Sequence, residues 1–272
     1  MYWSSSTNNA LASNPLGFMN KVGRLYHFEF AFKMLGWFIP PFAQMGFLSR
    51  IAGEILRSDS QFSDADLELE LSSLYEPHGL AAMVTHRYPV IPYVSQYEQT
   101  IAEAVEAHFL GLHHVATGGL ISVIEGAGRQ LLDSRNLGRS SIVNVFATLA
   151  KDCERQAIRR GIGATGEVLS MLASFSTFTS DVLYADSKRN PPADGTNRHG
   201  ISHGHFRDSQ YGRPLNFFKT IGAIDFLLFI ASFNANMSWF APDPSEKSEL
   251  LAVYYETLQT VGHSNPRTVA YP

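Results

Sequence analysis

The sequence has little cysteine and no excess of basic residues. Cys153 is the single cysteine, so the chain cannot form an internal disulfide and cannot hold a structural zinc ion through cysteine alone. Lysine and arginine total 21 against 25 aspartate and glutamate residues, which gives a formal net charge of -4 at pH 7. This balance excludes a uniformly positive surface, so a nucleic acid would have to bind a local basic patch. The lack of disulfide signals predicts a cytoplasmic protein.

Long apolar runs free of charge are also lacking. The two nearest candidates, residues 28–48 and 215–233, are each interrupted by charged residues, and the first also contains a proline pair. A charge at the centre of a bilayer costs roughly 2.5–3.5 kcal/mol, so we expect core helices or partner-binding surfaces and no stable membrane insertion. Membrane contact by the first run is the remaining alternative. The interrupting residues are Glu29, Lys33, Pro40 and Pro41 in the first run and Lys219 and Asp225 in the second.

The chain does contain the material for a large core. Of its 272 residues, 45% are hydrophobic and 12% are aromatic, so wholesale disorder is excluded. Residues 1–14 and 262–272 are predicted to be flexible tails. Between them, a proline-containing connector over residues 76–94 separates an N-terminal helical segment of unknown role at 15–80 from a helical domain at 85–261.

Apolar residues recur at spacings of three and four along much of the chain, which is typical of amphipathic helices. Ser95 and Glu98 have the spacing of a capping box at the start of the first long helix, and Gly118-Gly119 predicts a break after it. Pro40-Pro41 divides the N-terminal apolar region into two short helices. Strand patterns are absent, so the predicted fold class is all-α, a helical bundle. Further helices are expected over residues 119–133, 141–160, 167–185, 214–234 and 245–260.

The densest polar cluster is the segment NRHGISHGH at residues 197–205. Five basic residues outnumber three acidic ones between residues 186 and 214, so this part of the chain can attract a phosphate despite the acidic total. The bases are Lys188, Arg189, Arg198, Arg207 and Arg213, and the acids are Asp186, Asp194 and Asp208.

Within this segment, Arg198 and His203 form an Arg-x4-His motif directly after Asn197. In the setting Asn-Arg-His-x-x-x-His-Gly, the motif resembles the catalytic motif of HEPN-domain proteins. The similarity covers roughly residues 85–235 and begins with a helix pair upstream of the motif. It also includes the steps Glu125-Gly126 and Tyr211-Gly212.

The resemblance implies an HEPN-like helical bundle with an additional N-terminal helical segment. It further implies a metal-independent endoribonuclease that acts on RNA as a homodimer, needs no cofactor, and serves as a toxin or antiviral defence effector. In that setting, residues 15–80 could bind an antitoxin or a sensor protein.

The motif residues suit the cleavage of RNA by its own 2′-hydroxyl. A histidine moves protons near neutral pH and an arginine binds phosphate oxygens through its planar fork, so the resemblance gives His203 the acid/base role and Arg198 the phosphate role. Asn197 either orients one of them or caps the helix. Positions five apart lie about 140° apart on an ideal helix, so we expect the pair of one chain not to converge and two chains to share the site. Glu125 is either a partner of Arg198 or a solvated residue.

Other polar residues near the motif are candidates for binding the substrate. They are Lys188, Arg189, His199, His205, Arg207 and Arg213.

Three other interpretations of the cluster stay open. A non-catalytic HEPN scaffold could use the basic groove to bind RNA or a protein. A metal-dependent hydrolase could use His199 and His203, four residues apart, with His205, Asp208 and either His113 or His114 as further ligands. The neighbouring arginines would repel a cation, so no metal is expected. The polar side chains could instead only cap helices and satisfy a dimer interface.

Overall fold

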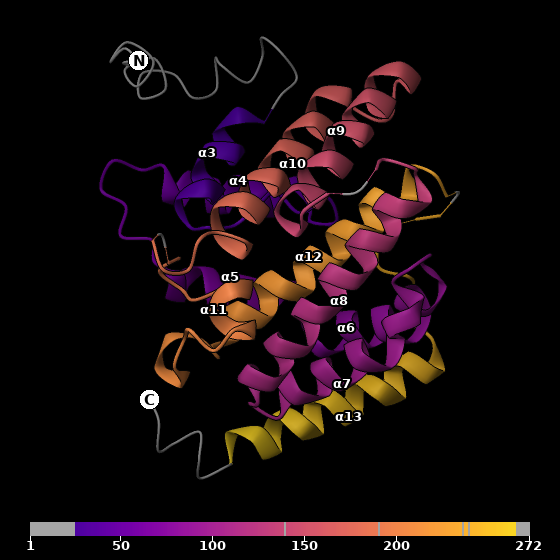
Figure 1. The fold of residues 1–272 in the computed structure, drawn as a ribbon. Coiled ribbons are helices and arrows are strands. Elements are labelled where there is room, and N and C mark those ends of the chain that lie inside the picture. The colour runs from indigo at the N-terminus through magenta and orange to yellow at the C-terminus, as the bar shows by residue number, and fades with distance from the viewer. Residues whose placement is uncertain (1–24, 139, 190, 236, 239, 265–272) are drawn as a thin grey trace.

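The computed structural model describes residues 25–138, 140–189, 191–235, 237–238 and 240–264 of the protein, and the part of the chain described is built from helices without a strand (Figure 1). The predicted all-α class is therefore confirmed. The expected tail at 1–14 lies outside the described residues. At the other end, Gly262 and His263 still belong to the last helix, so the tail predicted from residue 262 begins too early.

The α-helices are, in chain order, α3 (Tyr26–Met34), α4 (Met45–Ile55), α5 (Asp64–Leu74), α6 (Pro77–Ala82), α7 (Glu98–Phe109), α8 (His113–Ser134), α9 (Ile142–Arg160), α10 (Thr165–Phe178), α11 (Arg198–Ser202), α12 (Pro214–Ser232) and α13 (Glu246–His263). Short π-helical turns at Met83–Arg87 and Thr179–Leu183 extend α6 and α10. Three 3₁₀ turns lie at Tyr88–Val90, Ser95–Tyr97 and Asp208–Gln210.

Helix α12 runs through the middle of the bundle, with α8 beside it and α13 crossing below α7 (Figure 1). Every residue from Leu215 to Ala231 is buried. By length and composition α12 is the one helix in the described part of the chain that could cross a membrane, yet 94% of its apolar stretch is buried inside the protein. Such burial is what a core helix requires.

Two ionisable side chains of α12, Lys219 and Asp225, are buried, and each has a polar partner. The Nζ atom of Lys219 lies 2.5 Å from Asp194 Oδ2 and 2.6 Å from the carbonyl oxygen of Leu35. The hydroxyl of Tyr88 donates a hydrogen bond of 2.9 Å to Asp225. Burial raises the pKa of Asp225 to about 7. Each group is thus satisfied, as buried polar groups must be.

The N-terminal segment packs into the same hydrophobic core as the rest of the chain. Helices α3 and α4 are separated at Pro40-Pro41, which confirms the prediction of two short helices. Between them Trp37 and Phe38 are fully buried, and the Phe38 ring meets the edges of Phe175 and Phe226 at centroid distances of 5.2 and 5.7 Å. Residues 28–48 therefore contribute several of their large apolar side chains to the core.

Three local predictions are wrong. Ser95 lies in a 3₁₀ turn and makes no capping hydrogen bond, so α7 begins only at Glu98 without the expected capping box. Helix α8 passes through Gly118-Gly119 without a break, and the chain turns earlier, around Gly111. The connector at residues 76–94 is itself mostly helical turns.

Arginine side chains from α8 and α9 hold the C-terminal end of α12. Arg135 donates to the carbonyl oxygen of Ile230 at 2.5 Å, and Arg160 donates to that of Phe233 at 2.7 Å. Arg135 also lies 3.2 Å from the sulfur of Cys153. Burial raises the pKa of this thiol to about 11. Positive charges at this end of α12 are favourable because the last carbonyl groups of a helix carry partial negative charge.

Candidate functional site

The predicted motif lies on α11, a helix of five residues that starts after a buried asparagine. Asn197 is fully buried, and its Oδ1 accepts a hydrogen bond of 2.8 Å from the backbone N–H of Gly200. Its Nδ2 donates to the carbonyl oxygens of Val182 and Ala185 at 2.8 and 3.0 Å. Asn197 therefore takes the capping role, the second of its two expected roles, and ties α11 to the end of the π-turn.

Glycine residues fix where α11 can lie. A methyl group on Gly200 would come within 2.3 Å of the Phe206 ring, so the ring can cover the helix only because residue 200 has no side chain. Gly204 has a φ of 65°, which favours glycine, and it ends the helix. The two glycines thus account for the shortness of the motif helix.

Arg198, Glu125 and His203 come together in one chain. The Nε atom of Arg198 lies 2.6 Å from Glu125 Oε1 on α8, and Nη2 lies 3.4 Å from Oε2. Its Nη1 lies 2.7 Å from Nε2 of His203. Glu125 and Arg198 are each about one-fifth exposed, so the pair is partly shielded from water. Of the two expected roles of Glu125, the structure supports that of a partner of Arg198.

The prediction that the pair of one chain would not converge is wrong. It assumed an ideal helix through both residues, but α11 ends at Ser202 and His203 already has the non-helical angles φ -102° and ψ 7°. The histidine side chain therefore turns back toward Arg198. A guanidinium group can only donate, so Nε2 of His203 accepts this hydrogen bond and is the unprotonated ring nitrogen.

The three histidines of the segment form a row of neighbouring rings. The His199 and His203 rings are stacked at 5.7 Å, and the His205 ring follows at 6.1 Å from His203. Burial, with a smaller contribution from Arg198, lowers the pKa of His199 below its ordinary value. Ser187 anchors His205 through a contact of 3.0 Å between Oγ and Nδ1. The exposed side of the site thus carries His203 and His205.

The predicted basic residues separate into two groups. The exposed Lys188 and Arg189 follow Ser187 directly, so they belong to the loop that contacts His205. Arg213 instead pairs with two acids of α5, Glu68 at 3.4 Å and Asp64 at 4.0 Å, so its charge is largely compensated. Arg207 is exposed in the loop that follows the motif.

Two residues near the motif were missed by the sequence analysis. Tyr184 is buried with a hydroxyl that has no hydrogen-bond partner in the described part of the chain. Burial, and then the charge of Glu125, raise its pKa, while Arg198 and Arg129 oppose the rise. Arg129 is exposed. Because its charge opposes the rise in the pKa of Tyr184, it lies near this centre. The signal was present, because Arg129 is four residues after Glu125 and shares its helix face.

The histidine row does not have the geometry of a metal site. Among the residues that the structure describes, no group of three or more histidine, cysteine, aspartate or glutamate side chains is arranged to hold a metal ion. The guanidinium group of Arg198, which lies 2.7 Å from Nε2 of His203, would also repel a cation. The arrangement instead suits an anion, which can approach Arg198 from the exposed side of the site.

No protein-family model matches the chain, and comparison with curated protein sequences and with solved structures finds no similar protein. The site therefore has to be interpreted from its own geometry.

Proposed function

We propose that the protein is a metal-independent endoribonuclease of the HEPN type that cleaves RNA through attack of a 2′-hydroxyl on the adjacent phosphate. The observation that supports this proposal is the contact of 2.7 Å between Arg198 Nη1 and His203 Nε2, with Glu125 holding the other side of the guanidinium. An arginine, whose guanidinium suits a phosphate, and an imidazole nitrogen that can accept a proton thus lie side by side near the surface.

The reaction would begin when a phosphate oxygen replaces His203 as the acceptor for Arg198. Nε2 of His203 is then free to take the proton of the 2′-hydroxyl, whose oxygen attacks phosphorus. The bond from phosphorus to the 5′-oxygen breaks, and that oxygen needs a proton from a second acid. In a homodimer, His203 of the second copy supplies it from the imidazolium form and becomes neutral, while the first ring keeps the proton of the 2′-hydroxyl, so the two rings exchange protonation states in the reaction. The products are a 2′,3′-cyclic phosphate and a 5′-hydroxyl, and water is not consumed.

The surroundings support an anionic substrate. Lys188 and Arg189 are exposed on the loop beside His205, and Arg129 adds a further positive charge close to Tyr184. These groups would contact the phosphates that flank the cleaved bond and make binding depend on salt. Lys188 and Arg189 thus keep their proposed role in substrate binding.

The test is cleavage of an end-labelled RNA of mixed sequence in excess EDTA. We expect the wild-type protein to release 2′,3′-cyclic phosphate ends, and Arg198→Ala and His203→Ala to lose at least about 100-fold in rate. Arg155→Ala and His78→Ala are matched controls, because both side chains are exposed and lie on α9 and α6. Equal rates for all five proteins would contradict the proposal.

A non-catalytic scaffold that binds RNA is the second candidate. It is favoured by the fact that Arg198, Glu125 and His203 already satisfy one another without a substrate. The two functions differ in the behaviour of His203→Ala, which loses turnover and keeps binding only in an enzyme. RNA binding by the wild type without cleavage would support the scaffold.

The biological role we propose is that of a toxin or antiviral defence effector in the cytoplasm. The N-terminal segment is the proposed surface for an antitoxin or sensor. Its helix α3 exposes Phe30 and Met34, which are 49% and 60% accessible to solvent. Apolar side chains at these positions would suit a protein partner.

A further inference from the structure

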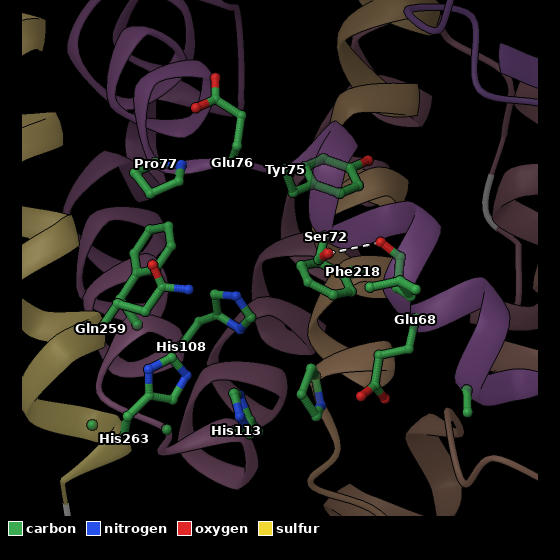
Figure 2. Close-up of a pocket in the computed structure, with 16 residues that line it drawn as sticks. Glu68, Ser72, Tyr75, Glu76, Pro77, His108, His113, Phe218, Gln259 and His263 are labelled. Carbon is green, nitrogen blue, oxygen red and sulfur yellow. Dashed lines mark hydrogen bonds between the residues drawn. The ribbon is translucent and has the colours of Figure 1, made fainter.

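A cavity of about 560 Å³ lies between the N-terminal segment and the last helix. Helix α5 forms one wall, α13 forms the opposite wall, and the turn from α7 to α8 together with α12 closes the space between them (Figure 2). Its size is that of sites for small organic ligands. None of the residues of the Arg198 site lines it.

Three imidazole rings gather on one side of the cavity, from His108, His113 and His263 (Figure 2). His108 is only 9% exposed, and its ring stacks on Phe217 at 3.9 Å. The Nδ1 atoms of His108 and His113 are buried and have no hydrogen-bond partner in the described part of the chain. Because these Nδ1 atoms have almost no accessible surface, a ligand in the cavity can bond only the other ring nitrogen, Nε2, of each histidine.

The charge of the cavity wall selects against anions. Glu68 and Glu76 line it, and no lysine or arginine does. Burial lowers the pKa of His108 well below its ordinary value and that of His113 to about 4, so both rings are neutral at pH 7. Arg213 lies 3.4 Å from Glu68, but it does not line the cavity and is shared with Asp64, so a phosphate or carboxylate would meet Glu68 and Glu76 without a lysine or arginine in the wall.

The carboxylate of Glu68 also offers an acceptor. Its Oε2 accepts a hydrogen bond of 3.2 Å from the backbone N–H of Leu215 and lies 3.4 Å from Nη2 of Arg213. No described residue donates a hydrogen bond to its Oε1. In Figure 2 Glu68 faces the histidine group across the cavity. Tyr75 and Phe218, stacked at 5.8 Å, add an aromatic surface nearby. A flat ring with N–H groups on one edge and ring nitrogens on the other would match this arrangement.

We propose that this cavity binds an uncharged purine, as the free base or the nucleoside. The exocyclic amine would donate to Glu68, the ring nitrogens would bond the neutral imidazoles, and the ring would lie against the aromatic side chains. A nucleotide of the same base would bind more weakly because of its phosphate.

The experiment is isothermal titration of the full-length protein with adenosine, adenine and AMP. Helix α5 offers a matched pair of variants, because Ser72 and Ser73 are neighbouring exposed residues that both bond a backbone carbonyl three residues earlier, and only Ser72 lines the cavity. Ser72→Trp would fill the cavity, whereas Ser73→Trp would add the same ring outside it.

We expect saturable binding of adenosine or adenine, a loss of at least about tenfold in Ser72→Trp, wild-type affinity in Ser73→Trp, and AMP at least about tenfold weaker than adenosine. His108→Phe keeps the ring stacked on Phe217 but removes both nitrogens, and it should weaken binding by about tenfold. The idea is overturned if neither adenine nor adenosine binds, if both tryptophan variants bind like the wild type, or if AMP binds as tightly as adenosine.

The purine site and the proposed nuclease activity can be tested independently of each other. Arg198→Ala should bind adenosine as the wild type does, since Arg198 does not line the cavity. Loss of adenosine binding in Arg198→Ala of wild-type stability would contradict the assignment of the ligand to this cavity.

Discussion

At the scale of single residues, Glu125 orients the guanidinium of Arg198. The two side chains meet through two contacts, at 2.6 and 3.4 Å, and both are about one-fifth exposed. Glu125→Gln keeps the shape of the side chain and removes its charge. We expect a loss of about 1 kcal/mol in the free energy of unfolding, because a partly exposed charged pair is worth roughly that amount.

Urea denaturation measures this loss, and RNA cleavage measures its consequence for the site. We expect the cleavage rate of Glu125→Gln to fall, since Arg198 is then less well oriented. Glu103→Gln is the control, because Glu103 lies on α7 and its hydrogen bond in the described part of the chain comes from Gln99 on the same helix. Equal stability and equal cleavage in the two variants would argue against an orienting role for Glu125.

Asp225 makes stability depend on pH. Burial raises the pKa of Asp225 from its ordinary value near 3.8 to about 7 in the folded protein. Between these values the folded state binds a proton that the unfolded state has released, so stability falls as pH rises through this window and is level above it. Below the window both states are protonated and the full contribution is present.

Asp225→Asn resembles the protonated form at every pH and should remove this dependence. We expect the wild type to lose roughly 2–4 kcal/mol relative to Asp225→Asn between pH 4 and pH 8. Urea denaturation of both proteins at several pH values measures the difference. A wild type that gains stability relative to the variant as pH rises would show that Asp225 is ionised in the folded state.

At the scale of elements, the position of α11 depends on one buried side chain. Asn197 satisfies the N–H of Gly200 and the carbonyl oxygens of Val182 and Ala185. Asn197→Ala leaves all three without this partner, and we expect it to cost about 2–4 kcal/mol. Thermal denaturation measures the loss.

Asn197→Asp separates the two functions of this side chain. Aspartate can still accept from Gly200 but cannot donate to the two carbonyl oxygens. We expect it to be destabilised as well, with a charge buried at a position that is fully inaccessible. Wild-type stability of either variant would be incompatible with the role assigned to Asn197.

The elements that the sequence predicts best are those with both an apolar period and end signals. Helices α9, α12 and α13 lie within a few residues of their predicted bounds, and the side chain of Ser245 caps α13. Gly118-Gly119 is misleading because packing overrides propensity. A Cβ atom on Gly119 would make ordinary contacts of 3.8 and 3.9 Å with Thr100 and Ala104 of α7, so this glycine lies at the interface between the two helices.

The candidate site is only partly readable in the sequence. The Arg-x4-His spacing identified Arg198 and His203, and a pairing with Arg198 was one of two roles left open for Glu125. Their convergence within one chain was missed because it depends on backbone angles at the end of α11. Arg213 was assigned to the site because it is close in sequence, whereas its side chain pairs with α5. The side chains of residues that are close in sequence point in different directions where a loop turns, and the local sequence pattern does not predict those directions.

At the scale of the whole molecule, one buried ion pair joins three distant parts of the chain. Lys219 of α12 contacts Asp194, in the loop before α11, and the carbonyl oxygen of Leu35 after α3. The side chains of Lys219 and Asp194 are 1% and 4% exposed. Lys219→Met leaves the charge of Asp194 uncompensated in the core, so we expect a loss of about 3–5 kcal/mol.

The double variant Lys219→Met with Asp194→Asn is the informative comparison. It removes both charges and keeps one oxygen at residue 194 to accept from Thr196, whereas the new amide nitrogen can only donate where Asp194 accepts from the Thr196 hydroxyl. We expect it to recover part of the lost stability in urea denaturation. If the double variant is less stable than Lys219→Met alone, the charge of Asp194 is stabilised by other groups.

The reactivity of the Cys153 thiol can report how often the core of the protein opens, because this side chain is buried in the folded state. Its thiol is buried beneath Arg135, and its raised pKa keeps it protonated at neutral pH. A disulfide reagent such as Ellman's compound can therefore react only with molecules in which the packing around Cys153 has opened. Because the chain has one cysteine, the rate of colour release follows the population of that open state in the unmodified protein, without a dye or a mutation.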